Sequence, residues 1–308
     1  MWRSFLLKLS DNESLRRLIS GSGVARQIAL RFVAGETIGE AMGVAEELNR
    51  GGAAVELDYL GEHVVDEPRA EMAVNVYLNL VDRIAAANVE SHVSLKASQM
   101  GLELGDELVY RNCRRVAERA ALYGNFVWID MEDSSSTERT IQLYKKLRTI
   151  FDNVGIAIQA YLRRSRQDVE EILAVGGTVR LCKGAYNESR QVAFSQKSEV
   201  DNSFRSLVVT LLSSGCYHAI ATHDQTMIRH AVETARITGN HAFEFQMLYG
   251  VRRDVQRRLI RDGHLVRVYV PFGEQWYPYL MRRLAERPGN LLFVVKSVLS
   301  EFRARDVR

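Results

Sequence analysis

The fold is decided by the stretch of residues 155–186, which reads GIAIQAYLRRSRQDVEEILAVGGTVRLCKGAY. Two short apolar runs, residues 155–161 and 178–183, flank a pattern typical of an amphipathic helix, which ends at Gly176-Gly177. A strand, a helix and a second strand in direct succession indicate a βαβ unit. Its two strands would lie parallel in one sheet.

The same unit recurs along the rest of the chain. Eight apolar, β-branched runs alternate with helical patterns, at residues 53–60, 92–97, 126–132, 155–161, 178–183, 218–222, 241–247 and 265–272. Asp224 can cap the helix after the sixth run, and Ser165 with Asp168 nearly forms a capping box after the fourth. Eight units close a parallel sheet, so we predict an α/β fold of the (β/α)8 TIM-barrel type. The alternative is an open doubly wound sheet, but no GxGxxG motif follows the first run.

The barrel fills most of the chain. A length of 308 residues suits one barrel of about 250 residues with additions at its ends. We expect an N-terminal helical segment at residues 1–52, a catalytic barrel at residues 53–290, which is distorted and covered at its mouth by a helix, and a C-terminal helix at residues 291–308. With only four prolines, the chain has no proline-rich linker between these parts.

Composition narrows the class of protein. The chain is 46% hydrophobic and 26% charged, which is typical of a globular enzyme. Three cysteines without CxxC spacing indicate a reducing compartment. We expect no secretory signal, no transmembrane segment, no metal site and no nucleic-acid partner. Arginine clusters at residues 163–166 and 252–261 are either solvated helix faces or attracted to an anionic membrane. The sequence therefore predicts a cytoplasmic protein, peripheral at the inner membrane at most.

Polar residues gather where the predicted strands end. A single buried charge such as Glu244 is most simply a structural salt bridge, since buried charges need partners. Seven of the eight runs nevertheless carry polar residues at or near their ends, and the active sites of such barrels lie at the C-terminal ends of the strands. These residues are Lys96, Asp130, Gln159, Arg180 with Lys183, Thr222 with His223, Glu244 with Gln246, and Tyr269. They predict an active-site floor.

A second group follows the eighth run. Tyr279, Arg282, Arg283 and Glu286 share one face of a predicted helix, at positions i, i+3, i+4 and i+7. One interpretation is a solvated face with an Arg–Glu pair. The other is a pair of guanidiniums that bind a carboxylate. The pattern alone leaves both open.

The combination of these motifs resembles the proline dehydrogenase family. The match covers about residues 55 to 290 in order, and the motifs that carry it are SLK (94–96), WIDME (128–132), QAY (159–161), RLCKGAY (180–186), ATH (221–223), FEFQ (243–246), YVPFG (269–273) and YLMRRLAE (279–286). The match includes no second catalytic domain, so the chain resembles the monofunctional bacterial type.

The resemblance implies a role for each motif residue. FAD would lie on the strand ends, in contact with Met131, Gln159, Lys183, Gly184, Ala185, Thr222 and His223. Arg180 would lie near the reacting part of the flavin. Lys96, Arg282 and Arg283 would hold the carboxylate of L-proline, Tyr269 and Tyr279 would wall its ring, and Asp130 would orient the cationic groups.

The reaction implied is oxidation of L-proline to Δ1-pyrroline-5-carboxylate by hydride transfer to the flavin, the first step of proline catabolism. A quinone-type acceptor, at the membrane, and a pyrroline-5-carboxylate dehydrogenase are the implied partners. Two alternatives stay open. Lys96 or Lys183 could form a Schiff base in a lyase or aldolase if its pKa were lowered. The barrel could also be a binding protein without catalytic activity.

Overall fold

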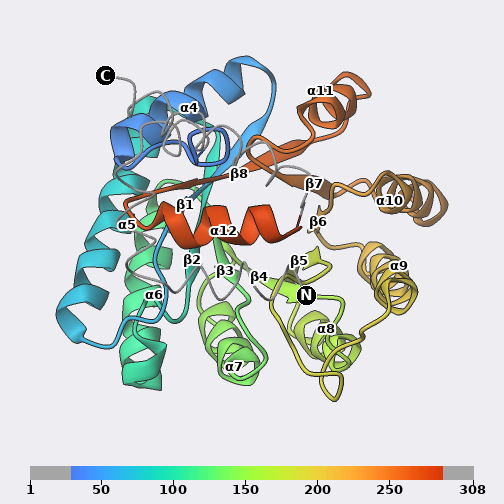
Figure 1. Cartoon of the computed structure of the whole chain (residues 1–308), viewed down its shortest axis with the longest axis horizontal. Helices are drawn as coiled ribbons and strands as arrows, with labels where there is room; N and C mark the ends of the chain where they lie inside the picture. Colours follow the sequence, from blue (N-terminus) through green and yellow to red (C-terminus); the bar gives the residue numbers. More distant parts are fainter. Residues whose placement is uncertain (1–28, 287–308) are drawn as a thin grey trace, which may run out of the picture.

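The computed structural model describes residues 29–286, with side chains up to Met281. Its centre is a closed barrel in which eight parallel strands follow one another in chain order, so that β8 pairs with β1. Figure 1 shows the helices arranged around this barrel. The predicted (β/α)8 barrel is confirmed. The helix expected at residues 291–308 and the first 28 residues of the expected N-terminal segment lie outside the described residues.

All eight predicted strands are present, and their bounds differ from the predicted ones by a few residues at most. The strands are β1 Ala54–Tyr59, β2 Ser91–Lys96, β3 Val127–Asp130, β4 Val154–Gln159, β5 Thr178–Cys182, β6 His218–Ala221, β7 Phe243–Leu248 and β8 Val266–Phe272.

Helices alternate with the strands. They are α4 Ile38–Arg50, α5 Glu67–Ala87, α6 Asp106–Leu122, α7 Thr137–Arg148, α8 Ser165–Ala174, α9 Lys197–Ser213, α10 Gln225–Thr238, α11 Arg253–Arg261 and α12 Trp276–Glu286, with a 3-10 turn at Leu102–Leu104. Within residues 29–286, no helix is long and apolar enough to cross a membrane.

The helix starts were predicted with mixed success. Asp224 caps α10 as expected, because its carboxylate accepts the backbone N–H of Thr226. The near capping box at α8 is wrong: Arg164 takes the cap position and no side chain caps the helix. The hydroxyl of Ser165 instead donates to the carbonyl of Gln159 (2.6 Å), at the end of the preceding strand. This bond ties the start of α8 to the barrel.

The two faces of the strands have different surroundings. Outward residues such as Val93, Ile156 and Val268 are buried under the helices and form the main hydrophobic core. Inward residues fill the barrel, and many of them are charged. Gly155 shows how tightly the interior is packed, because a Cβ at this position would collide with the indole ring of Trp128.

The barrel mouth is covered by α12, which crosses it in Figure 1. The start of the described chain helps to hold this helix. Ala34 donates its N–H to the carbonyl of Pro271 (2.8 Å), and Gly273 donates to the carbonyl of Gly35 (2.9 Å). The indole N–H of Trp276 donates to Glu36 (3.2 Å). Segments from both ends of the described chain therefore meet at the mouth, where the sequence predicted a covering helix.

Candidate active site

Lys96 lies at the C-terminal end of β2 and is almost completely buried. Its Nζ donates to both carboxylate oxygens of Asp58 on β1, at 2.8 and 2.9 Å, and lies 3.4 Å from Oδ2 of Asp130 on β3. Burial alone would lower the pKa of Lys96. The charges of Asp58 and Asp130 outweigh that effect and hold the pKa of the ammonium group well above its usual value.

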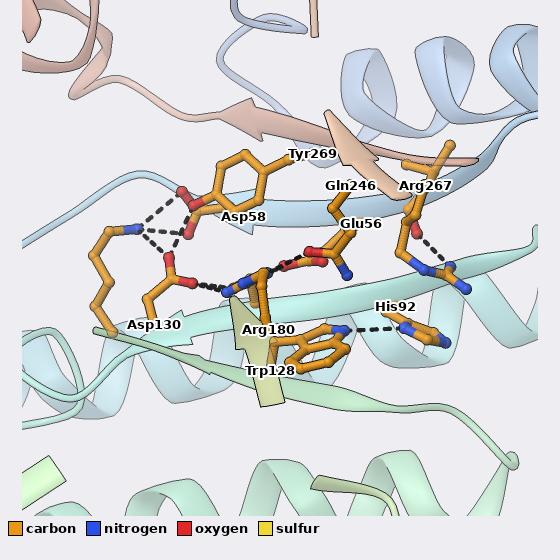
Figure 2. A network of polar contacts seen from close by, with 12 residues as sticks. Glu56, Asp58, His92, Trp128, Asp130, Arg180, Gln246, Arg267 and Tyr269 are labelled. Atoms are coloured by element: carbon orange, nitrogen blue, oxygen red, sulfur yellow. Dashed lines mark hydrogen bonds and ion pairs between the residues drawn. The ribbon is translucent and has the colours of Figure 1, made fainter. Parts of the chain in front are cut away.

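Arg180 reaches across the barrel from β5 and is 5% exposed. Its guanidinium forms ion pairs with Glu56 through Nη1 and with Asp130 through Nη2. Figure 2 shows the guanidinium between these two carboxylates. The group also lies over the rings of Trp128, at 5.1 Å, and Tyr269, at 5.7 Å. Because its partners lie on several strands, the planar guanidinium of Arg180 is fixed in position.

Asp130 connects the two cations. One of its oxygens accepts from Arg180 and, at 2.7 Å, from Ser94, and the other accepts the hydroxyl of Tyr269 at 2.9 Å. Burial would raise the pKa of Asp130, but the charges of Arg180 and Lys96 lower it below its usual value. We call Glu56, Asp58, Ser94, Lys96, Asp130, Arg180 and Tyr269 the upper cluster.

A second ionic group lies deeper in the barrel. Nε of Arg267 on β8 donates to both oxygens of Glu244 on β7, at 2.8 and 3.1 Å, and its Nη1 donates to the carbonyl of Val55. Trp128 donates to Nδ1 of His92 at 3.2 Å. We call Glu244, Arg267, Trp128 and His92 the lower cluster. Glu244 therefore forms a buried salt bridge, as expected from a charge on an apolar strand.

Gln246 connects the two clusters. Its side-chain oxygen accepts from Arg180 at 3.2 Å, and its Nε2 donates to Glu244 at 2.7 Å. Arg180, Glu56 and Gln246 therefore stand between the mouth and the lower pair, as Figure 2 shows. The buried charges form one continuous polar column through the barrel.

Several residues expected to contact a cofactor lie together after β4 and β5. Gln159, at the end of β4, is buried and donates to the carbonyl of Glu132, and its oxygen accepts from Ala185 at 3.4 Å. Gly184 has a φ of 110°, and a Cβ on it would overlap the ring of Tyr161. Only glycine fits this position.

The other expected cofactor residues lie near them at the same end of the barrel. Lys183 is bound by two carboxylates, Asp201 and Asp224. Thr222 accepts the backbone N–H of Asp224 at 3.1 Å, and Nε2 of His223 accepts that of Leu248 at 2.9 Å. The last of the group, Met131, is buried directly after β3. All these residues follow the ends of β3, β5 and β6.

The residues of α12 are only partly placed. Tyr279 is 6% exposed and packs in a small apolar cluster with Trp276 and Leu280. The backbone of α12 includes Arg282 and Arg283, but their side chains lie outside the described residues. The helix itself crosses the barrel in Figure 1.

Two residues of the upper cluster, Glu56 and Asp58, were not predicted from the sequence. Both are fully buried on β1 and form ion pairs with Arg180 and Lys96. The signal was present, because the two acids alternate with apolar residues in Val55-Glu56-Leu57-Asp58, which places both on one face of the strand. That run was interpreted only as a strand, so its charges were not counted.

The geometry argues against a Schiff-base lysine. Such a lysine must lose its proton before it can attack a carbonyl, which requires a lowered pKa. The pKa of Lys96 is raised, and its ammonium group is bound by two carboxylates. Lys183 also has two carboxylate partners. Both lysines are therefore held by carboxylates, and the raised pKa of Lys96 keeps its ammonium group protonated.

Known proteins are similar to this chain over most of its length. Residues 41–296 match the family model described as Proline dehydrogenase. The chain is 40% identical over 306 residues to Proline dehydrogenase 1 of Bacillus subtilis subsp. natto, with 98% of this chain and 100% of that protein covered. It is 37% identical over 310 residues to Proline dehydrogenase of Deinococcus radiodurans, with 97% and 98% covered.

A solved structure has the same fold. It is proline utilization A (PutA) from Bdellovibrio bacteriovorus inactivated by N-propargylglycine, which superposes with a TM-score of 0.79 at 26% identity. The match covers 84% of this chain and 32% of that protein, so the chain corresponds to about a third of PutA. The family model matches well over half of the chain, and the relatives are similar along almost their whole length. The chain therefore belongs to the proline dehydrogenase family.

Proposed function

We propose that this protein oxidises L-proline to Δ1-pyrroline-5-carboxylate with FAD as its cofactor, as the first step of proline catabolism. The observation that carries the proposal is the upper cluster, in which buried Arg180 and Lys96 lie at the strand ends of a barrel of this family. Bound FAD would supply the two-electron acceptor for the hydride from C5 of proline. A fixed guanidinium beside it would favour the electron-rich reduced ring.

The residues at the strand ends fit such a cofactor. Gly184 lets the turn after β5 pack directly against the ring of Tyr161, beside the buried amide of Gln159. Inward positions on β4 and β6 are small, with Ala157 on one strand and Ala219 and Ala221 on the other. We assign the cofactor contacts to Met131, Gln159, Lys183, Gly184, Ala185, Thr222 and His223.

The substrate would lie between the upper cluster and α12. Lys96 carries a charge that suits the proline carboxylate, and we propose that Arg282 and Arg283 bind the same group from above. Tyr269 and Tyr279 would wall the ring. Asp130 would orient Arg180 and Lys96, since it already contacts both of them.

The electrons must then leave the protein. We propose a quinone-type acceptor at the inner membrane and a cytoplasmic protein that visits the membrane surface. The product, a cyclic imine, would go to a pyrroline-5-carboxylate dehydrogenase. Oxygen consumption by membrane vesicles on addition of the protein and proline would test the acceptor.

One spectrum tests the central proposal. The purified protein should be yellow, and anaerobic L-proline should bleach its visible absorption. A colourless protein, or a flavin that proline does not reduce, would overturn the assignment. Acid precipitation should release the flavin into the supernatant, because we expect no covalent link.

A further experiment tests whether Arg282 and Arg283 bind the carboxylate of proline. Arg282→Lys and Arg283→Lys keep the charge but lose the planar fork, so each should raise the KM for proline roughly tenfold while the FAD content stays the same. Tetrahydrofuran-2-carboxylate should inhibit the parent enzyme and lose affinity in both variants. If pyrrolidine, which lacks the carboxylate, is oxidised as efficiently as proline, the arginines have no such role.

A further inference from the structure

Glu56 has no role in the function proposed so far. Its side chain is fully buried on β1, and a buried carboxylate costs free energy unless it is paired. Oε1 accepts from Nη1 of Arg180 across the barrel, whereas Oε2 is buried without a hydrogen-bond partner among the described residues. Within residues 29–281, Glu56 forms an ion pair with Arg180 alone. Arg180 is therefore the cation that Glu56 pairs with in the described part of the chain.

The environment of Arg180 shows what Glu56 contributes. Asp130 and Ser94 bind Nη2 on the side of the mouth, and Glu56 and Gln246 bind Nη1 on the deeper side. A guanidinium is a planar fork, so partners on both nitrogens fix the direction of its plane as well as its position. Without the charge of Glu56, Nη1 would keep only the neutral contact to Gln246.

Glu56 is also separated from the proposed substrate site. Asp58, two residues further along β1, holds Lys96, and Asp130 lies between Lys96 and Arg180. Glu56 lies on the other side of the guanidinium, towards Gln246 and Arg267 (Figure 2). It can therefore act on the reaction through Arg180 and not by direct contact with substrate.

We propose that Glu56 is a positioning residue for proline oxidation, which fixes the guanidinium of Arg180 beneath the flavin from the deeper side of the barrel. This inference rests on the proposed function. The alternative is that the Glu56–Arg180 pair only stabilises the barrel. The two differ in what happens to the flavin when Glu56 changes.

Glu56→Gln keeps the size of the side chain and an accepting oxygen, and removes the charge. The rate constant for flavin reduction by proline should fall roughly tenfold to a hundredfold, since small displacements of a reacting group have effects of this size. The KM for proline should change less than twofold. The midpoint potential of the flavin should become more positive, because loss of a nearby negative charge favours the electron-rich reduced form.

A double-mutant cycle tests whether Glu56 acts through Arg180. In an Arg180→Met background, Glu56→Gln should change the reduction rate less than twofold, since the group that it positions is gone. If its effect is as large there as in the parent, Glu56 acts by another route and the proposal is wrong. Glu56→Asp keeps the charge but is one methylene shorter. Glu56→Asp should slow flavin reduction with a smaller change of midpoint potential than Glu56→Gln. If Glu56→Gln does not fold, Glu56→Asp takes its place in the test.

Glu244→Gln is the matched control. It also removes a fully buried carboxylate with a guanidinium partner, but in the lower cluster. It should lower Tm as Glu56→Gln does, with the reduction rate within twofold of the parent and the potential unchanged. A Glu56→Gln variant that loses stability but keeps both rate and potential would overturn the inference. Failure of the parent to bind flavin or react with proline would instead overturn the proposed function.

Discussion

The upper and lower clusters are built from the same groups, arginines and carboxylates buried on neighbouring or facing strands. They differ in how completely these groups satisfy one another. Nε of Arg267 donates to both oxygens of Glu244, Nη1 of Arg267 binds a backbone carbonyl, and Gln246 also donates to Glu244. In the upper cluster, three carboxylates share Arg180 and Lys96, and two members, Lys96 and Asp130, are the last residues of their strands.

The difference shows how one barrel interior serves two purposes. A buried pair that is complete within the protein needs nothing from outside and stabilises one arrangement of strands. A buried group with more carboxylates than cations, close to an opening, has capacity for a further cationic partner, such as an amine. The depth and the balance of the charges, more than their presence, therefore separate the candidate active site from the structural core.

Loss of Arg180 should have the largest effect. Arg180→Met should slow flavin reduction by proline about 100- to 1,000-fold, the range for loss of a preorganised charge beside a reacting group. It should also lower the free energy of unfolding by about 3–5 kcal/mol, because Glu56 and Asp130 stay buried without their partner. Stopped-flow absorbance and urea unfolding measure the two effects. An unchanged reduction rate would place the upper cluster outside the reaction.

Loss of Arg267 should affect stability alone. Arg267→Met leaves Glu244 buried and unpaired, so we expect a loss of about 3–5 kcal/mol in the free energy of unfolding. The reduction rate, measured below the unfolding transition, should stay within about threefold of the parent. A loss of rate as large as that of Arg180→Met would remove the distinction between the clusters.

Asp58→Asn should shift the pH at which the affinity for a carboxylate ligand is lost. Lys96 must be protonated to attract a carboxylate, so the affinity for tetrahydrofuran-2-carboxylate should fall as the pH rises through the pKa of Lys96. Asp58 and Asp130 raise that pKa, and removal of one of them should lower it. The midpoint of the loss should therefore move to lower pH. A shift to higher pH would contradict the assigned pairing.

A surface ion pair should give the smallest effect. Arg115 on α6 binds Glu71 on α5 through two bonds of 2.6 and 2.8 Å, a geometry as good as that inside the barrel. Both side chains are more than a third exposed, so water and salt screen the pair. Arg115→Ala should change the free energy of unfolding by about 0.2–1 kcal/mol, less at high salt. A change above about 2 kcal/mol would show that depth is not the deciding factor.

Much of the architecture was predictable because the spacing of apolar residues alternates between the period of a strand and that of a helix. The unit at residues 155–186 is an example: it contains α8, β5 and all of β4 except its first residue, Val154. The start of α8 was predicted less well. Local rules suggested that Ser165 belongs to a capping box, but the carbonyl of Gln159 competes for its hydroxyl. A rule based on neighbouring residues cannot account for a hydrogen-bond partner that only the folded structure brings close.

The site was only partly predictable for a related reason. Lys96, Asp130, Arg180 and Tyr269 were identified at strand ends, and the structure brings them together. Their partners Glu56 and Asp58 were not, since contact across a barrel depends on strand tilt and register. Arg180 and Glu56 are 124 positions apart in the sequence. The alternation of acids on β1 shows that they share a face, but it does not name the residues opposite them.

The pairing of β8 with β1 has a consequence for how the protein folds. Arg267 donates to the carbonyl of Val55 across 212 positions of the chain, so the barrel closes only when its last strand is in place. Contacts of such long range form late, because the loop entropy must be lost first. Until then the interior carboxylates and guanidiniums stay hydrated. Most of their desolvation therefore occurs when the barrel closes. In variants that leave one buried charge without its partner, barrel closure should be slower at low salt.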